Sequence, residues 1–490
     1  MKLSRHLLIA TLAAVLTSAG LLAEERPLNI QFVRPLGMGG AFTAVADDHN
    51  IFTYNPAGMV QRTGAEVTIL EIAPGVSQDT IDAYNFIKDN QDDLTHWDKL
   101  TPARQAQLTN DISDTVSKLD PRVYLAADVA SFVSGPKFFG FPVHGGFGAF
   151  AGVDGTFNLD PGVIVPNISY SINADMVIPF ALAKRWNAPF RMPGKLGVGA
   201  TAKFIRRGQI KRDRLSILQL DNLDAPPVTL GKGFGGDLGF LYQPTNRVNV
   251  GLMIEDFGGT KIKYQETDAK EGYPAVPSYN AVIRPRTNVG VALVPQKLLW
   301  LLPSYERWTF SADINDIRAK NEHLLFQDGL RKPLGENLYT HLHLGAEFRY
   351  WFLRFRGGAN QGYPCFGLGV DIPFIKIDYA YYSRELGVHA GDRQEKNHVV
   401  SLALRFGSGN VEARERIKNA KEERKQRNMA VPAEATEVAP TTATPSTTAS
   451  DKATPTETPA ATPAKVEPAK AGPAKAGPAK AEPAGEEMPR

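Results

Sequence analysis

The chain has 490 residues, of which 43% are hydrophobic and 22% charged, and its formal net charge is +3. So small a charge argues against nucleic-acid binding, and we expect no nucleic acid among its partners. Its single cysteine, Cys365, excludes an intramolecular disulfide, and we expect this residue to be a small buried filler.

Residues 1–23 have the pattern of a secretory signal peptide. Lys2 and Arg5 precede an uncharged run over 7–23, and Ala23 before Glu24 offers a cleavage point. The run is shorter than the ~20 residues of a spanning helix, with an uncleaved anchor as the alternative, and no later apolar run approaches that length. If the chain enters a membrane, it does so as a β-barrel.

Residues 36–60, LGMGGAFTAVADDHNIFTYNPAGMV, differ from the rest of the chain. Glycines, an acidic pair and an Asn-Pro step favour turns here: Gly37, Gly39, Gly40, Asp47, Asp48, Asn55 and Pro56. The stretch is therefore predicted to be a compact, turn-rich plug of small residues, and the remaining chain to be its container.

Beyond residue 63, segments of about ten residues alternate apolar and polar side chains, which is the period of a β-strand. In 341–350 the apolar residues share one parity, and the other parity holds His341, His343, Gly345, Glu347 and Arg349. Fourteen strands are predicted, at 65–73, 122–131, 144–153, 173–184, 195–206, 234–243, 245–256, 284–294, 306–314, 341–350, 352–359, 364–371, 373–382 and 397–406.

Connection lengths distinguish a membrane barrel from a soluble sandwich, which has the same alternation. With a periplasmic N-terminus, most extracellular connections are long and most periplasmic ones short, which is the asymmetry of outer-membrane barrels. We predict an all-β fold: a 14-stranded antiparallel transmembrane β-barrel over 63–406, surrounded by the lipid of the cell outer membrane. A soluble periplasmic β-protein is the alternative.

The first long connection, 74–121, contains a predicted helix. Thr101 and Pro102 give an N-cap and a first helical residue, and apolar residues follow at helical spacing: Leu108, Ile112, Val116 and Leu119. A weaker helix is predicted near 81–87. We expect the apolar stripe to pack on the barrel rim and not to touch a substrate.

The composition changes after Phe406, because the remaining chain contains no Phe, Trp or Tyr. Such a segment cannot bury enough apolar surface to offset its ordering entropy. We predict a disordered periplasmic tail over 407–490, charged at 411–428 and then rich in Ala, Pro and Lys. Its role is that of a spacer or, alternatively, of a tether to the cell wall or a periplasmic partner.

No catalytic or phosphate-binding motif stands out, so we expect neither an enzyme nor a cofactor, and we assign no catalytic residue. His341 and His343 share a strand face and offer two ligands to a metal, but a polar pair facing the lumen is the preferred interpretation, and no metal is expected. The run LGKGFGGDLG at 230–239 leads into a strand without a following helix, which argues against a dinucleotide site.

Glycines recur within strands beside charged residues of the inward parity, at Gly199, Gly251, Gly345, Gly357 and Gly358. A glycine inside a strand often marks the close approach of another backbone, as a plug within a barrel requires. Three arginines, Arg349, Arg354 and Arg356, are candidate contacts for an anionic head group in the lumen, with solvated wall residues as the plainer alternative.

The stretch GMGGAFTAVADDHNIFTYNPAGM resembles the N-terminal signature of the FadL-like outer-membrane transporter superfamily, including its PorV-like branch. The region NQGYPCFGLGVDIPFIKIDYAYYSRELG, at 360–387, is similar to the end of the same barrels. The resemblance implies a 14-stranded barrel with an N-terminal hatch, here 24–62, inside the lumen. The resemblance assigns Gly37, Met38, Gly39 and Gly40 to the stretch of the hatch that leads into its Asn-Pro-Ala step. That step is formed here by Asn55, Pro56 and Ala57. The tail beyond Phe406 departs from the family pattern.

Two functions follow from the resemblance. The leading hypothesis is passive transport of long-chain fatty acids or other hydrophobic small molecules through a barrel gated by the hatch. The alternative is a PorV-like structural or secretion-accessory barrel that binds protein partners and transports no solute. The hatch motif occurs in both branches and does not separate them.

Overall fold

The structure, a computed structural model, describes residues 23–115, 118–160, 167–216, 227–269, 275–295, 307–319, 322–323, 330–331, 337–387 and 391–407. The predicted signal peptide up to residue 22 and the predicted tail from residue 408 lie outside the described residues.

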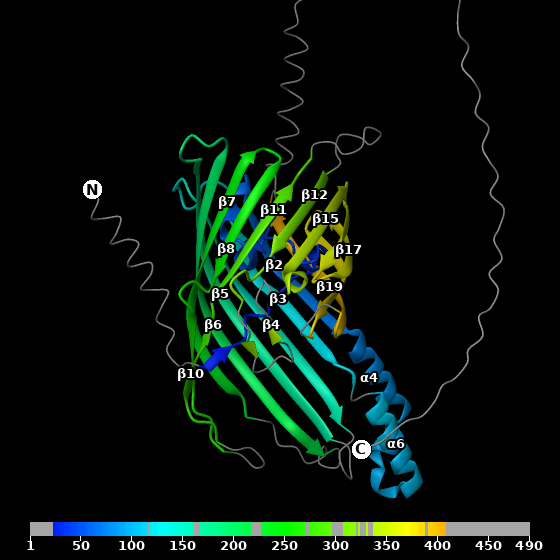
Figure 1. The fold of residues 1–490 in the computed structure, drawn as a ribbon. Coiled ribbons are helices and arrows are strands. Elements are labelled where there is room, and N and C mark those ends of the chain that lie inside the picture. The colour runs from blue at the N-terminus through cyan, green and yellow to red at the C-terminus, as the bar shows by residue number, and fades with distance from the viewer. Residues whose placement is uncertain are drawn as a thin grey trace, which may run out of the picture. The chain divides into compact units, whose positions relative to one another are not determined.

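Fourteen antiparallel strands close into one barrel (Figure 1), which confirms the predicted fold. In chain order they are β2 (Glu66–Ser77), β3 (Arg122–Val133), β4 (His144–Asp160), β5 (Asn167–Asn187), β6 (Lys195–Ser216), β7 (Thr229–Thr245), β8 (Val248–Glu255) with β9 (Thr260–Tyr264), β10 (Tyr279–Ile283) with β11 (Arg286–Leu293), β12 (Arg307–Ile314), β15 (Leu342–Tyr350), β16 (Leu353–Asn360), β17 (Tyr363–Ile372), β18 (Ile375–Glu385) and β19 (Gln394–Gly407). The barrel closes where β19 pairs with β2. A short hairpin, β13 (Glu322–His323) and β14 (Leu330–Arg331), stands apart from the barrel sheet.

Two of the fourteen strands are interrupted. β8 pairs with β11, and β9 pairs with β10 and with the first part of β7. Between β8 and β9, Asp256, Gly258 and Gly259 have positive φ angles, so the chain leaves the extended conformation there. The sequence prediction located β8 and β11 but missed their continuations, β9 and β10.

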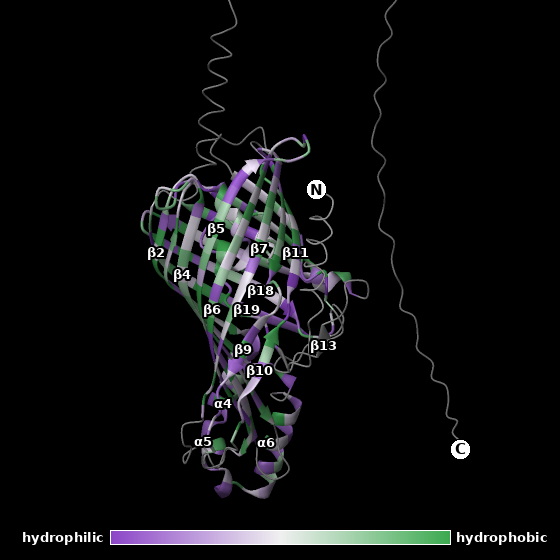
Figure 2. Ribbon diagram, turned by 90° about the vertical axis from the view of Figure 1, so that its left-hand side faces the viewer, coloured by the Kyte–Doolittle hydropathy of each residue, from purple (hydrophilic) through white to green (hydrophobic). Residues whose placement is uncertain are grey.

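Alternation along the strands sorts side chains between the inside and the outside of the barrel. In β5 the outward-facing side chains of Met176, Ile178, Phe180 and Leu182 are all more than 40% exposed, whereas Val177 is buried. Figure 2 shows hydrophobic and hydrophilic residues alternating along the strands. An exterior so rich in exposed aliphatic side chains is stable in lipid and not in water.

The connections at one end of the barrel are longer than those at the other. The end that holds 78–121, 265–278 and 315–341 is called the long-loop end, and the opposite end, where β7 joins β8 and β15 joins β16, the short-turn end. Helices α4 (Gln78–Asp89), α5 (Gln91–Thr95) and α6 (Pro102–Asp114) and the 3-10 helix η2 (Trp97–Lys99) lie beyond the long-loop end (Figure 1).

The helix predicted from Thr101 is confirmed, since the Thr101 side chain caps α6 and Pro102 is its first residue. The helix predicted near 81–87 corresponds to α4. Leu108 and Ile112 pack with Trp97 and with Leu159 of β4, so the stripe lies on the barrel rim, as expected. α6 ends at Asp114, and Val116 lies outside the described residues. None of the helices in the described ranges is long and apolar enough to cross a membrane.

Four turns at the short-turn end place a bulky aromatic residue in the left-handed region, which rarely accepts one. Phe139, Phe190, Trp351 and Phe374 have φ angles of 46°, 57°, 51° and 73°. This conformation costs a residue with a Cβ about 1–2 kcal/mol. Phe190 and Trp351 are 93% and 81% exposed, so intramolecular packing offsets little of that cost, although the Trp351 ring contacts that of Phe352. We expect partition of the rings into the membrane interface to offset it, because aromatic girdles border the lipid band of such barrels.

We therefore expect the Trp351→Asn variant to behave differently in detergent and in lipid. Asparagine accepts positive φ, so the variant should keep or gain stability in micelles and lose about 1 kcal/mol in lipid vesicles. Urea unfolding of both preparations measures this, and Gln361→Asn, at another position with positive φ, is the control. A variant more stable than the wild type in vesicles would contradict the anchoring role.

Candidate functional site: the barrel lumen and its N-terminal segment

The lumen of the barrel holds the chain from Glu25 to Arg62, here called the N-terminal segment (Figure 1, blue). Its first residue, Glu25, is the last residue of β1 (Ala23–Glu25), which pairs in parallel with β10. Three short helices follow: α2 (Val33–Gly37), α3 (Ile51–Tyr54) and the 3-10 helix η1 (Pro56–Gln61). α2 lies against β16, β17 and β18, and η1 lies against β5, β6 and β7, so the segment spans the lumen.

Ion pairs hold the start of the segment near the long-loop end. Arg207 of β6 lies 3.0 Å from Glu25, and the Tyr264 hydroxyl donates to Glu25 at 2.6 Å. Arg26 and Arg207 share the carboxylate of Asp175 at 3.3 Å and 2.6 Å. The chain then crosses the lumen and enters β2 from the short-turn end.

The Asn-Pro-Ala step fastens the segment to the wall. The Asn55 side-chain oxygen accepts from the Ala57 amide at 3.0 Å and thereby caps η1. The Asn55 amide group donates to the carbonyls of Thr43 in the segment at 2.9 Å and of Phe240 in β7 at 3.2 Å. Asn55 is fully buried, so its side chain replaces the water that these backbone groups would otherwise bind.

Glycines of the wall lie where the segment touches it. A Cβ atom on Gly199 would lie 2.5 Å from the Ala57 nitrogen, and one on Gly345 would lie 2.5 Å from the Met38 carbonyl oxygen. At Gly251 the Thr43 carbonyl oxygen would be 2.6 Å away. Close approach is thus confirmed at these three glycines.

The prediction that a wall glycine marks close approach of the N-terminal segment is wrong for Gly357 and Gly358. The nearest atom to a Cβ on Gly357 would be 3.9 Å away, and at Gly358 the close atom belongs to the adjacent strand β15. Six glycines that the sequence analysis did not single out do face the segment: Gly146, Gly152, Gly197, Gly239, Gly290 and Gly367. They lie within predicted strands or glycine-rich runs, so the same signal identifies them.

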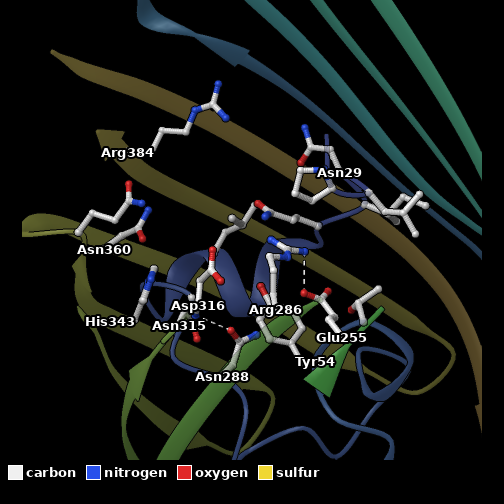
Figure 3. A pocket seen from close by; sticks show the side chains of 18 of the residues that line it. Asn29, Tyr54, Glu255, Arg286, Asn288, Asn315, Asp316, His343, Asn360 and Arg384 are labelled. Atoms are coloured by element: carbon white, nitrogen blue, oxygen red, sulfur yellow. Dashed lines mark hydrogen bonds and ion pairs between the residues drawn. The ribbon is translucent and has the colours of Figure 1, made fainter. Parts of the chain in front are cut away.

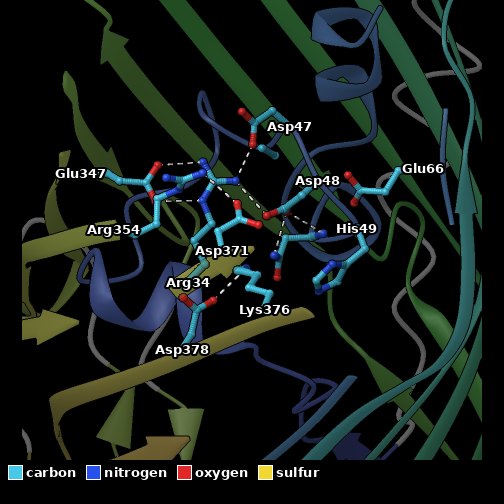
Figure 4. Close-up of polar contacts among 12 residues, drawn as sticks. Arg34, Asp47, Asp48, His49, Glu66, Glu347, Arg354, Asp371, Lys376 and Asp378 are labelled. Atoms are coloured by element: carbon cyan, nitrogen blue, oxygen red, sulfur yellow. Dashed lines mark hydrogen bonds and ion pairs between the residues drawn. The ribbon is translucent and has the colours of Figure 1, made fainter. Parts of the chain in front are cut away.

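Arg34 is the central cation of the segment (Figure 4). It pairs with Asp47 and, at 2.8 Å, with Asp48, and it reaches Glu347 of β15 at 3.1 Å. Burial opposes the charge of Asp48, but Arg34, His49 and Lys376 outweigh burial and hold the pKa of Asp48 well below its usual range. Burial also lowers the pKa of Arg34, and its three carboxylates more than compensate, so the net change is upward.

Three wall arginines were predicted as ligand contacts, and they occupy different positions. Arg356 pairs with Glu347 at 2.8 Å and with Asp378 at 2.9 Å, and its side chain is 1% exposed, so both of its neighbours are protein carboxylates. All three arginines line one cavity, in which Arg349 and Arg354 are less enclosed than Arg356. That cavity, of about 340 Å³, lies at the short-turn end and is bounded mainly by charged groups, among them Arg34, Asp47, Asp48 and Arg62. We call it the short-turn cavity.

A second cavity, of about 370 Å³, lies on the other side of the segment (Figure 3). Its lining includes Ile30, Phe52 and Tyr54 of the segment and residues at the long-loop ends of β8, β11, β12, β16 and β18. We call it the long-loop cavity. The N-terminal segment contributes to the walls of both cavities and separates them.

The histidine pair faces the lumen. His343 donates through Nδ1 to the Gly39 carbonyl at 2.8 Å, and His341 Nδ1 lies 2.8 Å from the Asn315 carbonyl oxygen. The first contact fastens the N-terminal segment to β15, and the second fastens the connection that follows β12. No cluster of three metal-ligating side chains occurs within the described ranges. Cys365 is buried with its sulfur 3.8 Å from the Gly37 carbonyl, as its interpretation as a filler implies.

The sequence analysis missed Glu25, Arg26 and Arg34, which carry most of the segment's charge pairing. Arg34 lies just before the glycine-rich motif, and a lone arginine has no recognisable pattern. The acidic pair Asp47 and Asp48 was the available signal, because two adjacent buried carboxylates require a cation.

The closed barrel with a lipid-compatible exterior and a filled lumen defines the class of protein: this is an outer-membrane β-barrel. No protein-family model and no curated protein matches the chain.

The chain is similar to several solved structures. They include the toluene transporter TodX of Pseudomonas putida, at 12% identity over 80% of this chain and 100% of that chain, with a TM-score of 0.39. The toluene transporter TbuX of Ralstonia pickettii matches at 15% identity over 77% and 99%, with a TM-score of 0.40. A FadL homologue of Pseudomonas aeruginosa matches at 12% identity over 78% and 99%, with a TM-score of 0.35. The last of these is described as a FadL homologue, which is the family that the N-terminal stretch of this sequence resembles.

A first prediction concerns the close contact at Gly345. Gly345→Ala places a Cβ against the Met38 backbone, so we expect the segment to shift at a cost of about 1–3 kcal/mol while the barrel stays closed. Limited proteolysis of the folded protein should then cut within residues 25–62 faster than in the wild type. Gly357→Ala, in the adjacent strand β16, is the matched control, and equal protection of both variants would refute the contact.

A second prediction concerns pH. The pKa of Asp48 is depressed in the folded state, so its pairing contributes stability in full above the ordinary carboxyl pKa of about 3.9 and loses it progressively below. We expect the protection of amides in the segment, measured as the exchange rate relative to the intrinsic rate at the same pH, to stay constant from pH 7 to about pH 4 and to fall at lower pH.

Asp48→Asn should weaken protection of the segment at every pH and reduce the acid-dependent loss. The exposed Asp89→Asn on α4 is its control. Loss of protection already between pH 7 and pH 5 would show that Asp48 does not control the segment.

Proposed function

We propose that the protein is a passive outer-membrane channel for hydrophobic small molecules, with the N-terminal segment as its hatch. The observation that carries this proposal is the pair of cavities on opposite sides of one non-covalently held segment. With the long-loop end outside the cell, a solute enters the long-loop cavity first. It reaches the periplasm when the segment shifts toward one wall.

The contacts of the segment support a movable hatch. Many of them are hydrogen bonds and ion pairs, which can exchange with water or with neighbouring charges. Its helices are short, the longest having six residues, so the segment can rearrange in parts. Arg349 and Arg354, which line the short-turn cavity, would be the wall residues that a solute meets on leaving.

The hatch can be tested with a reversible lock. A Cβ on Gly197 would lie 3.4 Å from the Val60 Cβ, close to the spacing of a disulfide. In a Cys365→Ala background, the double variant Val60→Cys and Gly197→Cys should join the segment to β6 on oxidation. We expect uptake of a hydrophobic dye, by cells with an intact lipopolysaccharide layer, to fall on oxidation to the rate without the protein and to recover with reductant.

Each single-cysteine variant is a control for the chemistry of oxidation. Uptake that stays unchanged when the disulfide has formed would refute the hatch. Folded wild-type protein that gives no uptake of either a neutral dye or a long-chain fatty acid would refute transport and favour the scaffolding alternative.

A further inference from the structure

The long-loop cavity has a polar corner near the segment (Figure 3). Glu255 of β8 and Arg286 of β11 pair there at 2.6 Å, beside Tyr54 of α3. Asn288 of β11 accepts from the Asp316 amide at 2.8 Å, beside Asn315. Adjacent strands in register bring these side chains together, because Arg286 pairs with Glu255 and Val289 with Ile314.

Hydrogen-bonding capacity in this corner remains unused. Among the described residues, Arg286 Nε and the Asn315 side-chain oxygen are buried without a partner. The Tyr54 hydroxyl likewise makes no hydrogen bond to a described residue. Burial, with Asp313 and Glu255 nearby, raises the pKa of Tyr54, so the phenol keeps its proton and can donate it. Buried polar groups without partners are costly, and a ligand that supplies partners relieves that cost.

Another part of the lining of the same cavity is apolar. Ile30 and Phe52 of the segment face Phe150 of β4 and Val177 of β5, and all four are buried. Phe52 and Phe150 have ring centroids 5.5 Å apart. A ligand that spans the cavity therefore meets hydrocarbon at one end and hydrogen-bonding groups at the other.

Every cation that lines the cavity is already neutralised. Lys203 lies 2.8 Å from both Asp237 and Asp256, Arg286 is paired with Glu255, and Arg384 is hydrogen-bonded to Glu395 at 3.1 Å. Three cations line the cavity, Lys203, Arg286 and Arg384, against four carboxylates, Asp237, Glu255, Asp316 and Glu385. A carboxylate ligand would enter a site with a surplus of negative charge and no free cation to receive it.

From this arrangement we infer that the long-loop cavity binds uncharged amphiphiles, with an apolar body against Ile30 and Phe52 and one hydrogen-bonding group at Tyr54, Glu255 and Arg286. This inference rests on the proposed function and specifies its solute class. The cavity should bind alcohols, phenols, amides and esters more tightly than carboxylates, and also more tightly than plain hydrocarbons.

Ligands of one chain length test the selection. Full-length protein in lipid nanodiscs, loaded with a neutral fluorescent amphiphile, is titrated with 1-octanol, octanoate or octane at pH 8, where the acid is ionised. Octanol should displace the probe at the lowest concentration. Octanoate that displaces it as well as octanol, or octane that equals octanol, would overturn the inference.

Two variants locate the polar contact. Tyr54→Phe removes one hydroxyl and should weaken octanol binding by about 3- to 10-fold while leaving octane unchanged. Tyr84→Phe, on the exposed face of α4, is the matched control. Glu255→Gln keeps the shape of the side chain but releases the charge of Arg286, so octanoate binding should improve by about tenfold. An unchanged octanol affinity in Tyr54→Phe, or an unchanged octanoate affinity in Glu255→Gln, would refute the assigned corner.

The disulfide lock distinguishes the failure of this inference from the failure of the proposed function. If ligands bind in the predicted order but the oxidised lock does not stop uptake, the cavity assignment stands and the hatch fails. If the lock stops uptake but the ligands show no such order, the channel stands and the solute class is wrong.

Discussion

The buried pairing of Arg34 with Asp47, Asp48 and Glu347 is the interaction on which the filled lumen depends. Two of these carboxylates belong to the segment and the third to β15, so one guanidinium both folds the segment and joins it to the wall. Removing one partner of a buried pair typically costs about 3–5 kcal/mol, because the remaining charge has lost its compensation. Glu347 also binds Arg349 and Arg356, which links the segment to charges on β15 and β16.

The size of the barrel makes such a filling necessary. Barrel diameter grows with strand number, and fourteen strands enclose more space than the wall's own side chains can fill. Gly199 and Gly345 remove side chains where the segment approaches, so backbone packs directly on backbone. Some inward charges do the reverse, because they have partners on the segment: Glu347 binds Arg34, and Asp175 and Arg207 bind Arg26 and Glu25. Small residues and paired charges together position a segment that no covalent bond attaches to the wall beyond its junction with β2.

The parts of all fourteen strands within the lipid band were predicted from alternation, because a wall with lipid on one side and a polar lumen on the other imposes a period of two there. The extensions of β5 and β6 toward the long-loop end were missed, since outside the lipid band the outward parity need not be apolar: Arg212 lies on that parity of β6, where it pairs with Tyr170 of β5. β9 and β10 were missed for the same reason. The contact role of wall glycines was predicted from their position in strands, but Gly357 and Gly358 show that such a glycine can also serve the sheet itself.

The ion pairs were beyond the reach of sequence analysis, since they join residues far apart in the chain. Arg34 and Glu347 are 313 positions apart, and neither has a distinctive neighbour. Arg356 has the same sequence context as Arg354, yet its charge is enclosed between Glu347 and Asp378. The pairing of neighbouring strands decides which carboxylates lie beside an inward arginine. These carboxylates in turn decide whether the arginine can bind a ligand.

The two faces of the segment differ in chemistry, and in the proposed channel this difference separates the side that binds a hydrophobic solute from the side that releases it. Toward the long-loop cavity the segment presents Ile30 and Phe52, and toward the short-turn cavity it presents Arg34, Asp47 and Asp48. An apolar body gains free energy from burial on the first side, whereas the second side is bounded mainly by paired charged groups, beside which it gains less. A passive channel cannot change the equilibrium across the membrane. It can, however, capture a dilute hydrophobic solute on one side and hold it weakly on the other, so that release does not limit the flux.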